Sequence, residues 1–332
     1  MEKITVESGN SCYDSRDNCN SIIDKKTNTL IVGCKNSIIP NSVTRIGDSA
    51  FEYCSGLTEL TLPNSVASIG DSAFEYCSGL TKLTLPNSIT SIGYSAFYGC
   101  SGLTELTLPN SVTSIGDSAF YVCRGLEKIT VESGNSCYDS RDNCNSIIDK
   151  KTNTLIVGCK NSIIPNSVTS IGSGAFAYCS GLTELTLPNS VTSIGYAAFR
   201  GCSGLTELTL PNSVTSIGER AFEGCTGLTE LTLPNSVKSI GDGAFAYCSG
   251  MTELTLPNSV TSIGDGAFGD CSGLSKITSL AEIPPVCGSG VFDRVNKTNC
   301  ELIVPVISVI AYKQAEVWNE FSNIRGFVGE KK

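Results

Sequence analysis

The chain is 332 residues long, carries a formal net charge of −9 and contains no histidine. The lack of histidine excludes Ser-His-Asp triads, imidazole acid–base chemistry and most zinc sites. Its 23 lysines and arginines are scattered singly, so the sequence offers no basic footprint for nucleic acid. No apolar run reaches the ~18 residues that a membrane-spanning helix needs, so we expect no membrane insertion of this segment.

A repeated unit of 23 residues organises the sequence and is complete in residues 57–79, LTELTLPNSVASIGDSAFEYCSG. Self-similarity at a fixed period of about 20–50 residues indicates a solenoid, in which each unit forms one coil stacked on its neighbours. We expect roughly eleven coils and one elongated body. The Ala-Phe-x-x-Cys motif of the unit occurs nine times, with its cysteine at Cys54, Cys77, Cys100, Cys123, Cys179, Cys202, Cys225, Cys248 and Cys271.

Each unit begins with a short strand. Leu60 and Leu62 alternate with Glu59 and Thr61, a period of two that places the leucines inside and the polar side chains outside. Pro63 lacks the N–H that a strand ladder needs, and therefore ends the strand.

The second half of the unit carries a further inward-facing segment and a turn. Val66 and Ile69 point inward from a β-branched segment that favours a second, shorter strand. Gly70 is expected to permit a sharp bend, and residues 71–72 to cap the turn after it. Residues 73–77 are too few for a real α-helix but suit one helical turn, with alanine, phenylalanine and cysteine on its inner side.

A single coil of this kind should not fold alone. About eight inward side chains would contribute roughly 2 kcal/mol each. Ordering the backbone costs roughly 1–2 kcal/mol per residue. Over the whole unit this cost exceeds the contribution of the inward side chains. Stability must therefore come from hydrogen bonds and apolar layers shared between coils.

A second level of duplication interrupts the array. Residues 2–44 return without a single change at 127–169. In the first copy the runs 21–24 and 29–32 flank a polar Lys-Lys-Thr-Asn turn, which predicts two short strands in a hairpin or an enlarged coil. The inserted cassettes are placed at residues 7–38 and 132–163.

The repeat pattern decays after Cys271. We expect the solenoid to span residues 1–280 and a C-terminal cap of one strand and one helix to span 281–332. The helix is predicted to start near Ser308, which could cap it, and to present an apolar face that includes Ile310, Trp318 and Phe321. Such a helix would cover the strand edge and the leucine layer of the last coil.

The first residue occupies the place of a unit's first leucine, because residues 1–6 match 126–131 in all but that position. The chain thus starts inside a repeat. We expect it to be part of a longer secreted protein whose signal peptide lies upstream.

Seventeen cysteines would allow disulfides in an oxidising compartment. The nine in the Ala-Phe-x-x-Cys motif are expected to be buried thiols, because cysteine beside an inward phenylalanine behaves as a small hydrophobe. The other eight lie in irregular segments, where bridges, free thiols or Cys-only zinc ligation all remain open. These eight are Cys12, Cys19, Cys34, Cys137, Cys144, Cys159, Cys287 and Cys300.

One outward strand position carries a charge in nearly every unit, and we take it as the candidate partner-binding face. Along the array, the charges at this position alternate in sign in the first half of the chain. In the second half four glutamates follow one another, and this row of like charges could receive a basic partner or cations. The alternative is a solvated face that serves solubility only. Paired carboxylates can also indicate glycoside hydrolysis, but a flat ladder offers no enclosed pocket. The candidate residues are Glu59, Lys82, Glu105, Glu184, Glu207, Glu230 and Glu253, with Lys128 and Lys276 at the same position.

The pattern LxxLxLPNSVTSIGxxAFxxCSG resembles the BspA-like leucine-rich repeats of bacterial and protist surface proteins, over nearly the whole chain. The resemblance implies a right-handed α/β repeat solenoid with a parallel β-sheet on its concave face.

It further implies a cell-surface or secreted protein that binds host or neighbouring-cell proteins in adhesion, such as matrix or surface proteins, without a cofactor. The residues themselves support an extended, non-enzymatic binding surface. Two alternatives remain, a structural spacer without a specific ligand and an unrecognised enzyme. The near-identity of the coils argues against an enzyme, because a catalytic site needs singular residues.

Overall fold

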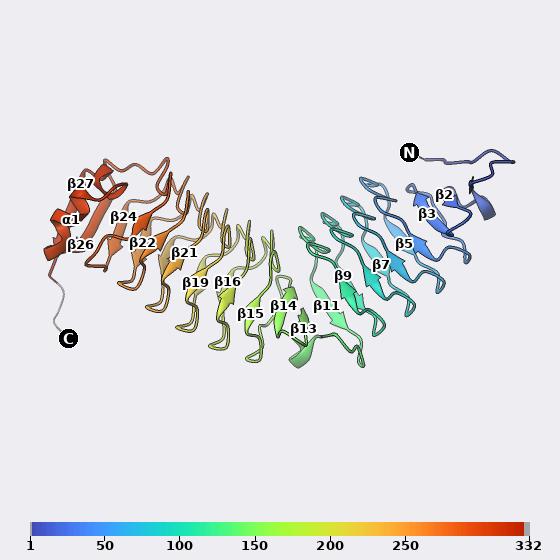
Figure 1. Ribbon diagram of the computed structural model, residues 1–332, viewed down its shortest axis with the longest axis horizontal. Coiled ribbons are helices and arrows are strands. Elements are labelled where there is room, and N and C mark those ends of the chain that lie inside the picture. The colour runs from blue at the N-terminus through green and yellow to red at the C-terminus, as the bar shows by residue number, and fades with distance from the viewer. Residues whose placement is uncertain (1, 329–332) are drawn as a thin grey trace. The chain divides into compact units, whose positions relative to one another are not determined.

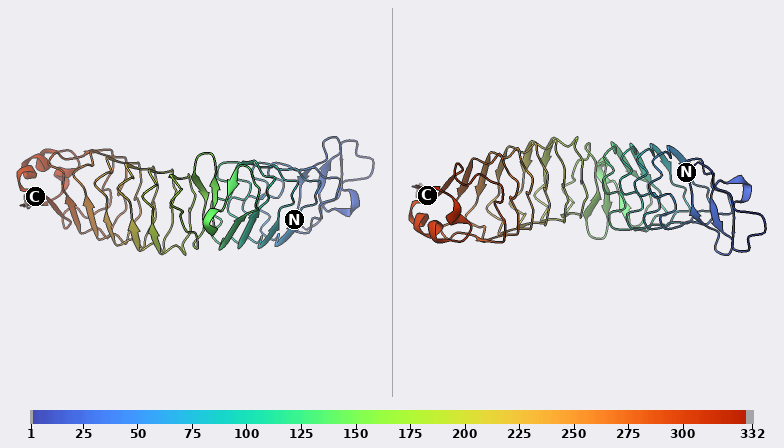
Figure 2. Two further views of the ribbon diagram at one scale, coloured as in Figure 1. Left: turned by 90° about the horizontal axis from the view of Figure 1, so that it is seen from below. Right: turned by 90° about the horizontal axis from the view of Figure 1, so that it is seen from above.

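The computed structural model describes residues 2–328, which fall into two compact units, Met1–Ile163 (unit 1) and Ile164–Lys332 (unit 2). Within each unit, coil follows coil in a regular stack, which can be traced by colour in Figure 1 and in the two views of Figure 2. The described residues form a parallel β-solenoid of about 12 turns, so the predicted solenoid class is confirmed.

Each coil contributes two strands to two separate ladders. In unit 1 the first strand, such as β5 (Glu59–Thr61), pairs in parallel with the first strand of the next coil, β7 (Lys82–Thr84). The second strand, such as β6 (Ser68–Ile69), pairs in parallel with β8 (Ser91–Ile92). Both strands of the coil were predicted from the alternation and the β-branched segment.

The remaining elements repeat this arrangement. Unit 1 also holds β1 (Tyr13–Asp14), η1 (Arg16–Asn18), β2 (Ile22–Asp24), β3 (Thr29–Val32), β4 (Arg45–Ile46), β9 (Glu105–Leu108), β10 (Ser114–Ile115), β11 (Lys128–Val131), β12 (Tyr138–Asp139), η2 (Arg141–Asn143), β13 (Ile147–Asp149) and β14 (Thr154–Val157). Unit 2 holds β15 (Ser170–Ile171), β16 (Glu184–Thr186), β17 (Ser193–Ile194), β18 (Glu207–Thr209), β19 (Ser216–Ile217), β20 (Glu230–Thr232), β21 (Ser239–Ile240), β22 (Glu253–Leu256), β23 (Ser262–Ile263), β24 (Lys276–Ser279), β25 (Val286–Cys287), β26 (Glu301–Pro305), η3 (Val306–Ser308), α1 (Val309–Gln314), η4 (Trp318–Glu320) and β27 (Asn323–Phe327).

The first-strand ladder is interrupted once in each unit. In unit 1, β5 pairs with β7 and β9 pairs with β11, but β7 and β9 belong to different sheets. In unit 2 the same break separates the β16–β18 pair from the sheet that starts at β20. Leu83 and Leu208, on the strands that precede the two breaks, are only half-buried, whereas Leu60 is buried. These breaks could not be predicted from the residues, because the strands on both sides are nearly identical.

The core consists of the residues that the unit pattern placed inside. Phe51, Phe74 and Phe97 are buried and stack in order along unit 1, with ring centroids 5.2 Å apart at both steps. Unit 2 continues the same pattern from Phe176 to Phe292. Because each ring contacts the rings of both neighbouring coils, burial is shared between coils, as expected for a solenoid.

The segment predicted as one helical turn is instead a series of tight turns. Ser72 and Tyr76 have φ values of 52° and 56°, in the left-handed region, and two such residues within five positions are incompatible with a helix. The coils are therefore built from strands and turns, and the α part of the expected α/β class is confined to the cap helix α1.

The glycine after the second strand does not serve only to permit the expected bend, because neighbouring coils also approach closely at this position. A Cβ at Gly93 would lie 2.6 Å from the backbone N of Asp71 in the preceding coil. Asp71 does not cap its own turn either, because its Oδ1 accepts the backbone N–H of Tyr94 in the next coil at 2.8 Å. Both residues thus hold neighbouring coils together.

The cassettes contain the expected two-strand hairpin, together with one additional strand and a 3-10 helix. In the first cassette β2 and β3 pair antiparallel, and the Asp24 carboxylate accepts the backbone N–H groups of Lys26 and Thr27 in the polar turn. An additional strand, β1, pairs antiparallel with β2, and the 3-10 helix η1 joins them. The second cassette repeats these elements as β12, η2, β13 and β14.

Coil features continue beyond residue 280, where the cap was expected to begin. Strand β25 pairs with β23, and Phe292 stacks on Phe268 at 5.7 Å. Strand β26 then pairs with β24, as a first strand of a coil would.

The cap differs from the prediction in four respects. Helix α1 spans six residues, Ser308 makes no capping hydrogen bond because it already lies in a 3-10 turn, and Ile310 is 71% exposed. The final strand, β27, was not predicted; it pairs with β26. Trp318 and Phe321 pack edge-on against Phe292, but both lie after helix α1, and strand β27 instead of a helix pairs with the edge of β26. Within the described part of the chain, no helix combines the length and the apolar character that crossing a bilayer requires.

Candidate partner-binding face

The charged side chains expected to face outward do so. We define the sheet face of a unit as the exposed side of its first strands, β5, β7, β9 and β11 in unit 1 and β16, β18, β20, β22 and β24 in unit 2. In β5 the inward Leu60 is 6% exposed, whereas Glu59 and Thr61 on either side are exposed. All seven candidate residues are exposed on a sheet face: Glu59, Lys82, Glu105, Glu184, Glu207, Glu230 and Glu253.

On the sheet face of unit 1 the charges alternate and compensate one another. Glu59 lies in register with Lys82, and Glu105 lies in register with Lys128. The Lys128 ammonium is 3.9 Å from a Glu105 carboxylate oxygen, and both side chains are well exposed. Such exposed pairs contribute about 0–1 kcal/mol each.

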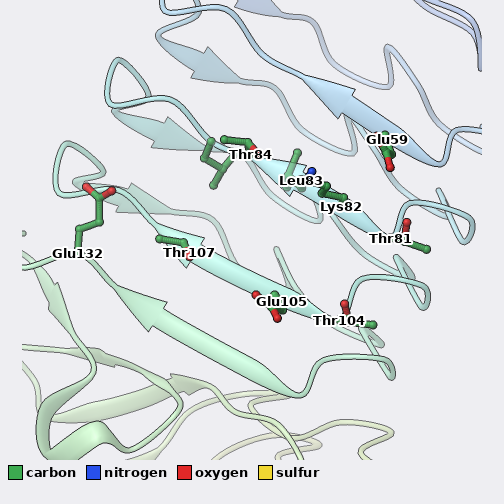
Figure 3. Close-up of a pocket in the computed structure, with 10 residues that line it drawn as sticks. Glu59, Thr81, Lys82, Leu83, Thr84, Thr104, Glu105, Thr107 and Glu132 are labelled. Carbon is green, nitrogen blue, oxygen red and sulfur yellow. The ribbon is translucent and has the colours of Figure 1, made fainter.

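The interruption between β7 and β9 creates a shallow open depression of about 680 Å3 on this face (Figure 3). Its lining includes Glu59, Lys82, Glu105 and Glu132, together with the half-buried Leu83. Figure 3 shows the side chains of Glu59, Lys82 and Glu105 on neighbouring strands. The depression is open to solvent and can therefore receive a protruding side chain of a partner.

On the sheet face of unit 2 the first four strands carry glutamate at this position, and only the fifth, β24, carries a lysine. Glu184 lies in register with Glu207, and Glu230 lies in register with Glu253. Lys276 neutralises only the last of them: its ammonium donates to Glu253 at 2.9 Å, and this hydrogen bond and charge raise the pKa of Lys276. We call the other three, Glu184, Glu207 and Glu230, the glutamate row; none of them takes part in an ion pair within the described residues.

The motif cysteines have a role that the sequence did not reveal. The thiol of Cys77 donates to the carbonyl of Phe51 in the preceding coil at 3.0 Å, and Cys100 donates to Phe74 at 3.2 Å. The same contact recurs at Cys123, Cys202, Cys225, Cys248 and Cys271. Each of these carbonyls also accepts a backbone N–H of its own coil, as the Phe51 carbonyl does from Cys54 at 3.0 Å. Cysteine combines a small apolar volume with a weak donor, so the thiol adds a hydrogen bond between coils.

Burial of the motif cysteines is confirmed for eight of the nine. Cys54 is the exception and is half-buried. Burial raises the pKa of Cys77 and of Cys271 to about 12, so these thiols are poor nucleophiles. The eight cysteines of the irregular segments, for which a bridge was left open, are also thiols in the structure: Cys12, Cys19, Cys34, Cys137, Cys144, Cys159, Cys287 and Cys300. The described residues hold no group of three or more His, Cys, Asp or Glu side chains placed to bind a metal ion.

A second exposed feature lies on the turns of unit 1 and was missed in the sequence. Tyr53 stacks on Tyr76 with ring centroids 5.0 Å apart, and Tyr98 stacks on Tyr121 at 5.3 Å. Tyr76 and Tyr98 meet edge to face at 5.2 Å, which joins the four rings into one tyrosine row. The signal was present, because each of four consecutive motifs carries a tyrosine between its phenylalanine and its cysteine.

The family described as BspA type leucine rich repeat region matches residues 21–148 and 146–275 of the chain, with six copies. These residues cover most of the sequence, and the coils described above are their structural counterpart. The chain therefore belongs to the BspA-type leucine-rich repeat family. No curated protein sequence matches the chain significantly.

Solved structures extend this relationship. A leucine rich cell surface protein from Faecalibacterium prausnitzii is 30% identical, with 75% of this chain and 79% of that chain covered and a TM-score of 0.57. The pneumococcal vaccine antigen PcpA is 27% identical, with coverage of 88% and 72% and a TM-score of 0.70. A leucine-rich repeat protein from Bacteroides ovatus, at 23% identity, 99% and 88% coverage and a TM-score of 0.55, supports the fold alone.

Proposed function

We propose that this protein is a non-enzymatic, secreted or cell-surface binding protein that uses its sheet face to adhere to proteins of a host or of neighbouring cells. The observation that carries the proposal is the glutamate row. Three carboxylates, Glu184, Glu207 and Glu230, project from parallel strands with no cation opposite them. Like charges on adjacent strands cost stability, and a basic partner would remove that cost on binding.

The surface location rests on two similar proteins. One of them is described as a cell surface protein and the other as a vaccine antigen, and both share the solenoid over more than two thirds of their length. The binding mode follows from the repetition, because equivalent weak sites along one partner raise avidity without any new type of contact. Affinity should therefore be distributed over the sheet face and its cassettes, and should fall as salt increases.

The proposal is tested with immobilised poly-L-lysine as a basic probe and the chain in solution. The triple variant Glu184→Lys, Glu207→Lys, Glu230→Lys should bind about tenfold more weakly, since three exposed charge contacts are worth about 0.2–1 kcal/mol each. The single substitutions should weaken binding in steps.

A control variant separates the glutamate row from net charge. Glu7→Lys, Asp117→Lys and Glu316→Lys change the net charge by the same amount at exposed positions away from the sheet-face charge positions. This control should keep most of the affinity. Equal losses of affinity in the two triple variants would show that only net charge matters. If the unmodified chain did not bind poly-L-lysine at all, the result would favour the alternative of a structural spacer without a specific ligand.

A further inference from the structure

The two copies of the duplicated stretch hold the strand segment and turn of residues 2–13 in the same internal geometry. The Asn10 side-chain oxygen accepts two backbone N–H groups of its turn at 2.9 Å, and Asn135 accepts the equivalent two at 2.8 Å. The N–H groups of Ile4 and Ile129 each donate to an asparagine side chain of their own cassette at 2.6 Å. The two copies therefore present the same groups toward the coil that precedes them.

In the second copy these groups bind a polypeptide segment, the strand and turn of residues 103–116, LTELTLPNSVTSIG. The Asn135 amide nitrogen donates to two carbonyls of this segment at 2.9 Å. The Tyr138 hydroxyl accepts the N–H of Ile115 at 3.2 Å. Glu132 donates its N–H to one backbone group of the segment and accepts another with its carboxylate. The second copy thus shows which kind of ligand this surface accepts.

In the first copy the same groups are open. Among the described residues, the Asn10 amide nitrogen and the N–H groups of Lys3 and Glu7 have no hydrogen-bond acceptor. Tyr13 is exposed, whereas Tyr138 is buried. An exposed strand edge with unpaired donors is a template on which a further strand can pair.

We propose that residues 2–13 form a docking site for a strand-and-turn segment of the LTELTLPNSVTSI type that a partner polypeptide supplies. The strand of the partner would pair in parallel with residues 3–6, as β9 pairs with β11, and its turn would contact Asn10 and Tyr13.

Charge complementarity sets the register of this docking. Lys128 lies in register with Glu105 in the second copy, so Lys3 should face the glutamate of the partner strand. A second copy of this chain offers no such segment, because every segment of this type in the described residues already pairs with the coil that follows it. The site lies in unit 1 and does not involve the glutamate row.

The test uses the whole chain, labelled with 15N, and titration with a synthetic peptide of residues 103–116 with blocked ends, observed by NMR. Because the two copies have the same sequence, the second copy supplies the reference for the bound state. The backbone signals of Lys3 and Glu7 and the side-chain signal of Asn10 should move in a saturable manner toward those of their equivalents, which should stay in place. A peptide that shifts neither copy, or both copies alike, would overturn the proposal.

Variants of the chain locate the contacts. Asn10→Ala should weaken peptide binding by about tenfold, because its equivalent makes two hydrogen bonds to the docked segment. Tyr13→Phe, which leaves the turn intact, should weaken binding by about two- to fivefold. The matched control is Tyr138→Phe, which should leave peptide binding unchanged because that site is already occupied. Equal losses in Tyr13→Phe and Tyr138→Phe would show that the peptide does not bind at the first copy.

Changes in the peptide test its register and its sequence. The Glu105→Lys peptide should bind the unmodified chain about two- to fivefold more weakly, and Lys3→Glu in the chain should restore the affinity. A scrambled peptide of the same composition should not bind. Equal binding of the scrambled peptide would show that any extended segment pairs with the edge, and the proposed recognition would be wrong.

Two further controls separate this site from other occupants and from the sheet face. The triple variant of the glutamate row should bind the peptide as the unmodified chain does, and Tyr13→Phe should bind poly-L-lysine normally, so the two proposals can fail separately. If the same signals of the first copy moved with protein concentration alone, a second copy of the chain would be the occupant and the proposal would be wrong.

Discussion

In the first copy of the duplicated stretch Asn10 and Tyr13 are exposed, whereas their equivalents in the second copy, Asn135 and Tyr138, are buried. The residues are identical from 2 to 44 and from 127 to 169, so the difference comes entirely from the surroundings of each copy. Tyr13 is 39% exposed and Tyr138 is 7% exposed.

The second copy docks on the coil before it, and the contacts are specific. The Asn135 side-chain amide donates to the carbonyls of Pro109 and Val112, both at 2.9 Å, and the Tyr138 hydroxyl accepts the backbone N–H of Ile115 at 3.2 Å. The strand β11 in this copy pairs with β9, but the identical residues 3–6 of the first copy form no strand. The order of a coil is thus supplied by the coil it stacks on.

The largest effect is expected at the asparagine pair. Asn135→Ala removes two buried hydrogen bonds to the preceding coil, and the Pro109 carbonyl keeps only the backbone N–H of Val112. This loss should lower the free energy of unfolding by about 2–3 kcal/mol. Asn10→Ala should cost less than about 1 kcal/mol. Urea denaturation of the two variants measures the difference.

This pair is its own control, because both asparagines make the same local contacts. The side-chain oxygen of each accepts two backbone N–H groups of its own turn, from Cys12 and Tyr13 in the first copy and from their equivalents in the second. The loss of unfolding free energy that the two variants share measures the contribution of these local hydrogen bonds. Equal losses in both variants would mean that docking on the preceding coil contributes nothing.

A smaller effect is expected at the tyrosine pair. Tyr138→Phe should cost about 1 kcal/mol, because the N–H of Ile115 loses its acceptor, and Tyr13→Phe should be nearly neutral. Burial raises the pKa of the Tyr138 hydroxyl, so the folded chain keeps this proton at a pH where the unfolded chain has lost it.

The stability linked to this proton is complete below the unfolded pKa of about 10 and is lost as the pH rises further. The alkaline loss of stability should therefore be less steep in Tyr138→Phe than in the wild type. Thermal unfolding at pH 8 to 11 measures it. A similar change in slope for Tyr13→Phe would contradict the assignment to Tyr138.

The comparison also shows what a sequence can and cannot predict here. The alternation in β5, the phenylalanine stack and the outward glutamates follow from periodicity within one coil, and they are found as expected. The burial of Asn135 could not be predicted, because Asn10 has the same local sequence and is exposed. The break between β7 and β9 and the Gly93 contact likewise depend on how one coil sits on the next.

Hydrogen exchange of the two copies in one sample tests most directly whether neighbouring coils supply the order of a coil. The intrinsic exchange rates are matched, because the residues and their sequence neighbours are the same, so only position differs. The amides of residues 3–35 should exchange faster than those of 128–160. The largest gap is expected between Glu7 and Glu132, because the Glu132 N–H donates to the carbonyl of Leu108 in the preceding coil at 2.9 Å. Equal protection of the two copies would show that each cassette is stable by itself, and would contradict the account.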